Sequence, residues 1–464
     1  MGVAISNWKL AKAVSESGEL GVVSGTGIGV VMISRLMNGD IGGHVRRALG
    51  AFPFQEPVRR LLKRYFIPEA PTTPVTYKRP AMWTLEPAAS LQELTTMANF
   101  AEVFLAKEGH SNPVGINLLE KVQLPILSSI YGAMLAGVDY LLIGAGVPWQ
   151  IPSVLDGLEH HESVRYRLEV RNVSREDDFR VCFDPRRLFP SIPEGYPRLK
   201  RPRFLPIVSS VVLAKSLIRQ AKKKIDGFVV ETSVAGGHNA PPRGREGTNG
   251  NGEVRYGEKD VVDLEKIKEL GLPFWVAGGY DDPEEIQRAM EAGATGVQVG
   301  TAFAYCEESG MRSDLKDSVL RKVIAEGVEV QTSSRVSPTG FPFKVVQVEN
   351  TISDSKTYAE RERLCDLGML RQAYKREDGE VGFRCASAPE KQFLAQGGKS
   401  EETIGRTCLC NNLLATAGYP QQRKDGYVEP PLLTAGDGLQ GLRKFMKPDE
   451  LNYTAKDVLD YLKG

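Results

Sequence analysis

Short apolar runs recur along the chain, and most of them lead into glycine or small polar residues. The clearest is Phe228-Val229-Val230, which follows Gly227 and leads into polar Glu231. An apolar run of this length is typical of a buried strand in a parallel sheet. Eight such runs are separated by helical patterns, at residues 20–23, 114–118, 140–143, 204–208, 228–230, 273–277, 296–299 and 328–333.

The intervening segments carry helical signals. Asp282-Pro283, for example, places a capping residue before proline at the first helical position. Helices are predicted over residues 10–18, 90–107, 125–136, 152–161, 211–224, 260–270, 282–292 and 313–326. Strands that alternate with helices predict an α/β fold, and eight strands fit a (β/α)8 TIM barrel. A doubly wound open sheet is the alternative.

The barrel is expected to occupy residues 1–335, with insertions at about 40–100, 163–200 and 239–256. Alternating apolar and charged residues over 163–184 predict an inserted hairpin. Residues 336–464 form a C-terminal extension that carries four cysteines.

Composition narrows the class of protein. The 464 residues are 41% hydrophobic and 25% charged, which is typical of a globular protein with a sizeable core. The net charge of +1 gives no indication of nucleic acid or a membrane surface as a partner. Six cysteines without a secretion signal favour the reducing cytoplasm. We expect a small-molecule partner, and the sequence leaves a homo-oligomer open.

Glycine and small polar residues gather where the predicted strands end. In barrels and open α/β sheets, ligands bind at these carboxyl ends. Two consecutive late strands end in Gly278-Gly279 and Gly300-Thr301, the pattern of a barrel phosphate site. The alternative is that the glycines only terminate the strands. Glycines at so many strand ends together disfavour that alternative.

His238 is the candidate catalytic residue. It follows Gly236-Gly237 just beyond a buried strand, where an imidazole can face the pocket. With an ordinary pKa of about 6.5 it would be a general base at neutral pH. The alternative is a loop histidine that only forms local hydrogen bonds.

Four cysteines lie close together in the C-terminal sequence and could bind zinc or an iron–sulfur cluster. Their spacing is not a repeated CxxC pair, so unrelated free thiols are the alternative. They are Cys365, Cys385, Cys408 and Cys410.

Several motifs resemble the nitronate monooxygenase family, which shares its fold and motifs with flavin-dependent enoyl-acyl-carrier-protein reductases. The resemblance lies in AVSESGELGVVSGTG, Asn117, AGGH at 235–238, VAGGYDDPEEIQRAMEAGA at 276–294 and GVQVGTAF at 296–303. It implies a TIM barrel that binds FMN, and an oxidoreductase in which His238 takes a proton from a nitroalkane or orients the nitronate. The products would be a carbonyl compound and nitrite.

The same resemblance implies a set of FMN-binding residues. The phosphate would lie on Gly278, Gly279 and Gln298–Thr301, and the Gly25-Thr26 turn and Asn117 would flank the flavin ring. The full expected set is Gly25, Thr26, Asn117, Gly236, Gly237, Gly278, Gly279, Gln298, Val299, Gly300 and Thr301.

The chain also departs from the family pattern. Val234-Ala235 stands where the family usually has Glu-Ala, and the following loop carries Arg243 and Arg245, which would suit an anionic substrate. The alternatives are therefore an enoyl-acyl-carrier-protein reductase, which would use NAD(P)H, and a non-catalytic scaffold that kept the barrel.

Overall fold

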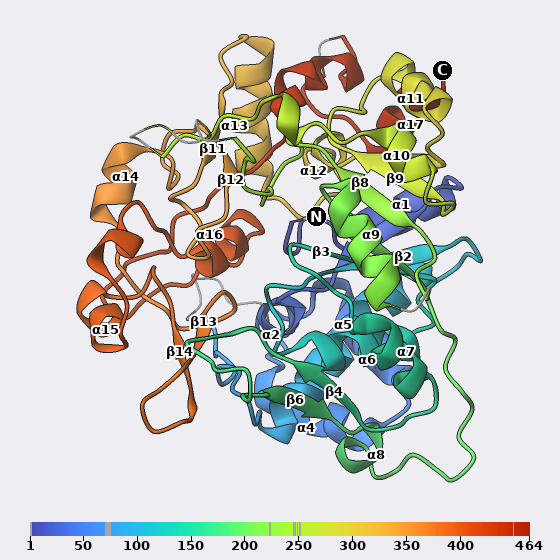
Figure 1. Ribbon diagram of the computed structural model, residues 1–464, viewed down its shortest axis with the longest axis vertical. Coiled ribbons are helices and arrows are strands. Elements are labelled where there is room, and N and C mark those ends of the chain that lie inside the picture. Colours follow the sequence, from blue (N-terminus) through green and yellow to red (C-terminus); the bar gives the residue numbers. More distant parts are fainter. Residues whose placement is uncertain are drawn as a thin grey trace.

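The computed structural model describes residues 2–69, 76–221, 224–244, 247, 249, 252–448 and 450–464. Its central feature is a curled parallel sheet, a half-barrel of seven strands in the order β1-β2-β3-β7-β8-β9-β10 (Figure 1). The strands are β1 (Gly21–Ser24), β2 (Val114–Leu119), β3 (Tyr140–Gly144), β7 (Arg203–Val208), β8 (Phe228–Glu231), β9 (Phe274–Ala277) and β10 (Gly296–Gln298). This confirms the α/β barrel-type fold.

The eighth predicted strand does form, but not in this sheet. Residues 328–333 contain β11 (Val330–Ser333), which pairs antiparallel with β12 (Phe343–Val346). Within the described residues the parallel sheet therefore has seven strands, and the predicted count of eight was wrong. An apolar run indicates that a strand forms, whereas its partner depends on residues far away in the sequence.

A segment near the N-terminus covers β1, one edge of the sheet. The Ser24 N–H donates to the Ser6 carbonyl (2.8 Å), and the Ser6 hydroxyl donates to the Val22 carbonyl (2.6 Å). The same N-terminal segment also accepts a hydrogen bond from farther along the chain, since the Gly310 N–H donates to the Ile5 carbonyl (2.9 Å). These bonds satisfy edge groups that would otherwise need water or another strand.

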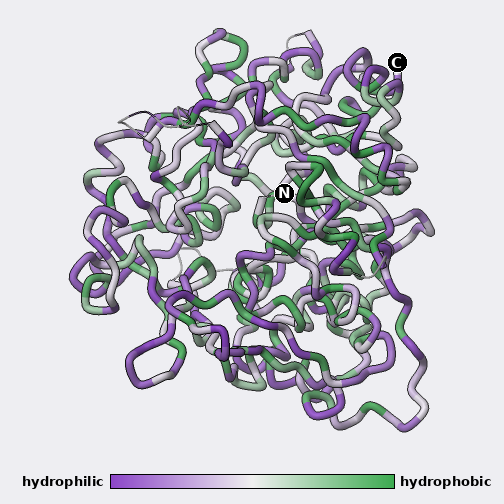
Figure 2. The backbone as a smooth tube through the Cα atoms, viewed as in Figure 1, coloured by the Kyte–Doolittle hydropathy of each residue, from purple (hydrophilic) through white to green (hydrophobic). Residues whose placement is uncertain are grey.

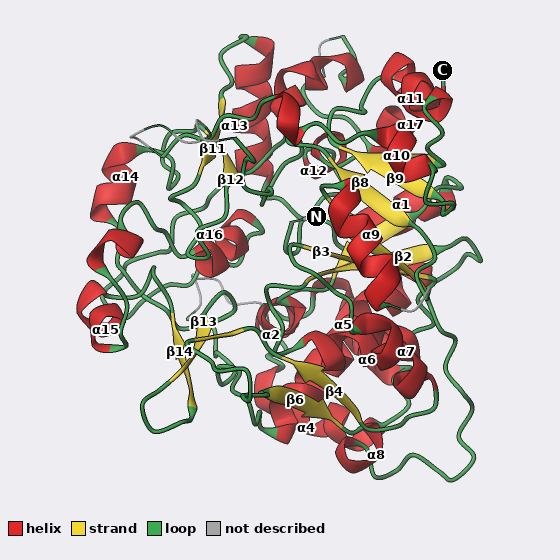
Figure 3. Cartoon of the chain, viewed as in Figure 1, coloured by secondary structure: helices red, strands yellow, loops and turns green. Residues whose placement is uncertain are grey.

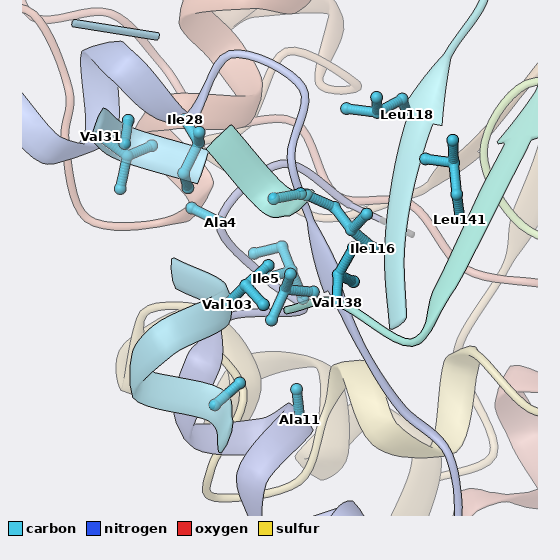
Figure 4. Packing of buried hydrophobic residues seen from close by; sticks show 14 of the residues in the cluster. Ala4, Ile5, Ala11, Ile28, Val31, Val103, Ile116, Leu118, Val138 and Leu141 are labelled. Carbon is cyan, nitrogen blue, oxygen red and sulfur yellow. The ribbon is translucent and has the colours of Figure 1, made fainter. Parts of the chain in front are cut away.

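Helices pack on the outside of the sheet. The longest, α5 (Ala89–Lys107), is buried on nearly all sides, so it belongs to the core, although the expected insertion extended to about residue 100. Its Val103 lies near Ile116 of β2 and Ala11 of α1 (Figure 4). The other helices up to residue 324 are α1 (Trp8–Glu16), α2 (Ile28–Met37), α3 (His44–Gly50), α4 (Gln55–Tyr65), α6 (Ile126–Leu135), α7 (Ile151–Glu159), α8 (Pro185–Leu188), α9 (Val211–Gln220), α10 (Leu264–Lys268), α11 (Pro283–Glu291), α12 (Thr301–Ala304) and α13 (Ser313–Ile324).

The predicted inserted hairpin is present. Its strands β4 (Val164–Arg167) and β6 (Arg180–Phe183) pair antiparallel and bury alternate residues. Between them, the short β5 (Val170–Arg171) pairs with β13 (Gln372–Lys375) of the C-terminal region. The insertion therefore ties the C-terminal region to the barrel.

The C-terminal region consists largely of loops with short helices and strands (Figure 3). The hydropathy trace shows only scattered apolar residues there, in contrast to the strands of the sheet (Figure 2). Its last helix, α17, nevertheless packs on α1 and α11. The remaining elements are α14 (Ser355–Glu360), β14 (Val381–Arg384), α15 (Glu390–Ala395), α16 (Leu409–Thr416) and α17 (Ala455–Lys463).

No helix in the described ranges has the length and apolar character that crossing a membrane requires.

Candidate functional site

The first two strands end in a tightly bonded corner. The Gly25 N–H donates to the Asn117 carbonyl (2.9 Å), and Thr26 Oγ1 accepts from the Leu119 N–H (3.1 Å). Asn117 Nδ2 donates to the Leu142 carbonyl (3.4 Å). A Cβ on Gly25 would lie 2.5 Å from Asn99 Oδ1, so this position excludes any side chain. These three expected ring-flanking residues therefore have partners within the protein.

The two late strand ends have the features of a phosphate cradle. Gly278 and Gly279 have φ of +96° and +82°, a left-handed backbone that glycine adopts readily. Gln298 Oε1 is buried and has no hydrogen-bond partner among the described residues, so it is free to bind a ligand. Nothing lies within 4 Å of a Cβ built on Gly300. Open space at Gly300 fits a bound group such as the FMN phosphate, whereas the acceptor oxygen of Gln298 suits a hydrogen-bond donor of a ligand.

Sequence reasoning missed a C-terminal segment that borders this site. The Gly436 N–H donates to Thr301 Oγ1 (2.8 Å), and the Gly237 N–H donates to Thr434 Oγ1 (3.0 Å). A Cβ on Gly236 would lie 2.8 Å from the Ala435 carbonyl carbon, so Gly236 is required by this packing. The run Thr434-Ala435-Gly436 was the available signal, a small-residue stretch that permits close backbone approach.

His238 lies at the same edge of the sheet and is half-buried. Its Nε2 is 2.7 Å from the Ser337 hydroxyl, and its ring meets Phe343 edge-on, with centroids 4.8 Å apart. Burial, and then the positive charge of Lys121, lower the pKa of His238 to about 3. The ordinary imidazole pKa expected from the sequence was therefore wrong, and the ring is neutral at physiological pH.

Sequence reasoning also missed Lys121, which interacts with His238, and two carboxyl groups that interact with Lys121. The ammonium of Lys121 lies over the Phe341 ring, 3.4 Å from its centroid. Burial lowers the Lys121 pKa to about 8 and raises the pKa of Glu231 to about 7, although the two charges attract. Burial likewise raises the Glu120 pKa to about 7. Carboxyl groups with pKa values this close to neutral are characteristic of functional sites.

Glu120 connects this group to the inserted hairpin. Its Oε1 accepts from the Tyr166 hydroxyl (2.9 Å) and from Gln123 Nε2 (2.6 Å). A Cβ on Gly146 would lie 2.0 Å from Glu120 Oε2, so Gly146 makes room for this carboxyl. Gly146 therefore serves packing within the protein.

Arg243, in the loop after His238, has protein partners in place of the expected anion contact. Arg243 donates to the carbonyls of Ser209 and Lys259, so its guanidinium holds the loop to the end of β7. Arg245 lies outside the described residues. Among the described residues, Lys121 is the cation whose charge acts on His238.

The four C-terminal cysteines interact with one another. The neighbouring Cys385 raises the pKa of Cys365, and the neighbouring Cys408 raises the pKa of Cys410. No three His, Cys, Asp or Glu side chains in the described ranges are already arranged around a common metal position.

The fold defines a barrel-type α/β protein with a candidate ligand site at the carboxyl edge of its sheet. A family model described as nitronate monooxygenase matches residues 201–349, which run from β7 through β12. Over this segment the chain is similar to that family.

Curated relatives match over limited stretches. A nitronate monooxygenase of Pseudomonas aeruginosa is 31% identical over 124 residues, which cover 26% of this chain and 32% of that protein. A putative nitronate monooxygenase of Saccharomyces cerevisiae is 27% identical over 165 residues, which cover 33% of this chain and 38% of that protein. The matches thus span about a third of the length of these relatives.

Solved structures show a loose overall likeness. FabK from Thermotoga maritima aligns with 99% of this chain and 88% of its own, at a TM-score of 0.45 and 16% identity. The enoyl reductase domain of MlnA from Bacillus amyloliquefaciens covers 79% of this chain and 83% of its own, at a TM-score of 0.41 and 13% identity. At these scores neither structure bears on the site.

Proposed function

We propose that the protein is an FMN-dependent oxidoreductase that oxidises alkyl nitronates with O2 to a carbonyl compound and nitrite. The observation that carries this proposal is the juxtaposition of a phosphate cradle with a neutral histidine and a half-buried lysine. The cradle consists of the left-handed Gly278-Gly279 turn and the open space at Gly300. His238 and Lys121 interact electrostatically at the same edge of the sheet.

The residues of the cradle fit FMN. Gly278, Gly279 and Gln298–Thr301 would hold the phosphate, since backbone N–H groups at such turns bind anions. When bound, the flavin supplies the electron acceptor for the substrate and is reoxidised by O2.

The side chains then favour a substrate that is already ionised. A base works best when its pKa is near the working pH, and His238, with a pKa of about 3, is a weak base. A neutral imidazole can instead donate one hydrogen bond and orient a nitronate oxygen. Lys121, in its charged form, attracts the anion and opposes protonation of His238. We therefore infer that the nitronate, rather than the neutral nitroalkane, is the substrate.

The test compares substrates on the purified full-length protein. We expect flavin absorption bands, oxygen uptake with an alkyl nitronate, and nitrite as a product. Consumption of NAD(P)H with an enoyl thioester, without nitrite formation, would instead identify a reductase. Colourless protein that takes up no added FMN would identify a non-catalytic scaffold, and either result would reject the proposal.

Lys121→Met is the informative variant, with Lys215→Met as its matched control. Lys215 lies on α9, outside the residues that form the site. We expect the Lys121 variant to keep its flavin but to raise KM for the nitronate by about tenfold or more, equivalent to roughly 1.4 kcal/mol of lost attraction. An unchanged KM would remove Lys121 from substrate binding.

A further inference from the structure

A loop between β11 and β12 places two hydroxyl groups next to the ring of His238. The Ser337 hydroxyl lies 2.7 Å from His238 Nε2 on one side and 2.7 Å from Thr339 Oγ1 on the other. Ser337 is fully buried, so its hydroxyl depends on partners of this kind. The two hydroxyl groups and the imidazole therefore form one hydrogen-bonded chain.

Both sides of the contact between Ser337 and His238 are fixed by other parts of the fold. Arg406 Nη1 donates to the carbonyls of Ser334 (2.8 Å) and Ser337 (2.7 Å), which holds the loop. On the other side, His238 forms an antiparallel β-bridge with Phe343 and packs its ring edge-on against the Phe343 ring. The hydroxyl and the imidazole are therefore held in place by more than their own hydrogen bond.

The donors and acceptors along this chain indicate its direction. A hydroxyl group has one proton to donate and can accept two hydrogen bonds. Thr339 directs two donors at Ser337 Oγ, its backbone N–H (3.3 Å) and its hydroxyl (2.7 Å). With both acceptor positions of Ser337 filled in this way, the Ser337 proton is left for Nε2 of His238. The Thr339 oxygen in turn accepts from the Phe341 N–H (3.4 Å).

The opposite direction satisfies fewer groups. If His238 Nε2 donated to Ser337, the Ser337 hydroxyl would have to donate to Thr339 Oγ1. The proton of half-buried Thr339 would then have no acceptor among the described residues, because its oxygen contacts only Ser337 and the Phe341 N–H there. A hydrogen bond left unmade costs free energy. The first direction is therefore favoured.

We propose that Ser337 donates its hydroxyl proton to His238 Nε2, so that the neutral imidazole carries its own proton on Nδ1 and donates it to the anionic substrate. In a neutral imidazole, the hydrogen bond made by one nitrogen sets whether the other is protonated. Among the described residues Nδ1 has no hydrogen-bond partner, so it is the nitrogen left for a ligand. The identity of the anion rests on the proposed function, whereas the position of the proton does not.

A proton on Nδ1 gives the site a donor where an anion needs one. Lys121, whose charge acts on His238, supplies the neighbouring cation. An imidazole N–H and an ammonium can both donate to a nitronate oxygen, and hydrogen bonds to an ionised acceptor are stronger than neutral ones. A bare Nδ1 would instead direct its lone pair at the anion and repel it. Ser337 is therefore a positioning residue, which acts on the substrate through the tautomer of His238.

NMR of the full-length protein reads the tautomer directly. The protein is labelled with isotopic nitrogen in its five histidines, and the signals of His238 are identified by their loss in His238→Asn. At about pH 8 even an imidazole with an ordinary pKa is neutral, so the result does not depend on the lowered pKa of this ring. We expect the proton on Nδ1, and a proton on Nε2 would overturn the proposal.

Variants of the loop test whether Ser337 is the cause. In Ser337→Ala the ratio of the Nδ1–H form to the Nε2–H form should fall by about tenfold or more, equivalent to about 1.4 kcal/mol. Ser334→Ala is the matched control, because this hydroxyl on the same loop donates to the Gly252 carbonyl (3.0 Å). Thr339→Val should also keep the tautomer, since it leaves Ser337 no acceptor other than His238.

An unchanged ratio in Ser337→Ala, or an equal fall in Ser334→Ala, would overturn the role of Ser337. If Ser337→Ala fails to fold, the wild-type spectrum and Thr339→Val decide, and a loss of the Nδ1–H form in Thr339→Val would likewise overturn it. Assays with a nitronate separate this inference from the proposed function. A proton on Nδ1 without nitronate oxidation would support the tautomer and reject the function, whereas nitrite formation with the proton on Nε2 would reject the tautomer alone.

Discussion

Variants of the phosphate cradle should distinguish a loss of FMN binding from a loss of folding stability. A Cβ on Gly300 would meet no atom within 4 Å, and the backbone there has a φ of −117°, which any residue can adopt. Gly300→Ala should therefore change the free energy of unfolding by no more than about 0.5 kcal/mol. Gly300→Asp should also fold, but its carboxylate would face the phosphate. If the two charges lie about 4 Å apart at an effective dielectric of 20, their repulsion is about 4 kcal/mol.

That repulsion corresponds to roughly a thousandfold weaker binding of FMN. The contrasting variant is Gly278→Ala, at a φ of +96° where a Cβ would lie 2.4 Å from Thr232 Oγ1. Left-handed strain of about 1–3 kcal/mol and a clash of similar size should destabilise it by about 2–5 kcal/mol.

Urea unfolding measures the stability of each variant, and flavin fluorescence titration measures its affinity for FMN. We expect Gly300→Asp to lose FMN at nearly wild-type stability, and Gly278→Ala to lose stability. Full flavin content in a folded Gly300→Asp variant would refute the position of the phosphate site. If Gly300→Ala proves as destabilised as Gly278→Ala, the inference that a Cβ has room at Gly300 would be refuted.

Three further predictions follow from individual side chains. His238→Asn should lower turnover by a similar modest factor with a nitroalkane and with its nitronate; a selective loss of about 100- to 10,000-fold with the neutral nitroalkane would restore its role as general base. With its raised pKa, Glu120 keeps its proton in the folded state, whereas the unfolded state loses that proton above about pH 4.5. The free energy of unfolding should therefore fall as the pH rises toward 7. Glu120→Gln should therefore stabilise the protein by up to about 3 kcal/mol at pH 8 and much less at pH 5, as measured by urea unfolding; equal effects at both pH values would contradict the raised pKa. Glu102→Gln, which weakens the 2.7 Å ion pair with half-buried Arg35, should lower the unfolding free energy by about 3–5 kcal/mol, and a loss below 1 kcal/mol would show that the pair is solvated.

Local sequence patterns predicted most elements of the sheet. The run Phe228-Val229-Val230 lies in β8, and Asp282-Pro283 opens α11 with the Asp282 side chain capping Glu284. These features depend on residues close together in the chain, so the sequence displays them directly. The run over 328–333 was also a strand, but its partner lies in β12, and nothing within the run itself indicated this.

The residues of the candidate site likewise fall into two groups, those that the sequence revealed and those that only the folded structure revealed. The Gly278-Gly279 pair at the end of β9 was visible because its left-handed backbone favours glycine locally, whereas Gly300 after β10 has an ordinary φ. Lys121, Glu231 and Ser337 were not singled out, since each is an ordinary polar residue until the fold brings Ser337 and Lys121 to His238 and Glu231 to Lys121. The pKa of His238 was predicted wrongly for the same reason, because burial and the charge of Lys121 are properties of the folded chain.

The sequence alone determined the alternation of strands and helices, the glycine turns, and the histidine that follows the central strand. These are encoded by backbone preference and by short-range hydrophobic periodicity. Only the tertiary structure decided that the parallel sheet of the described residues has seven strands and that Thr434–Gly436 borders the cradle. It also decided that the four C-terminal cysteines influence one another's pKa values. Such contacts join residues more than a hundred positions apart in several cases, and their energies arise from burial and charge that exist only after the chain has folded.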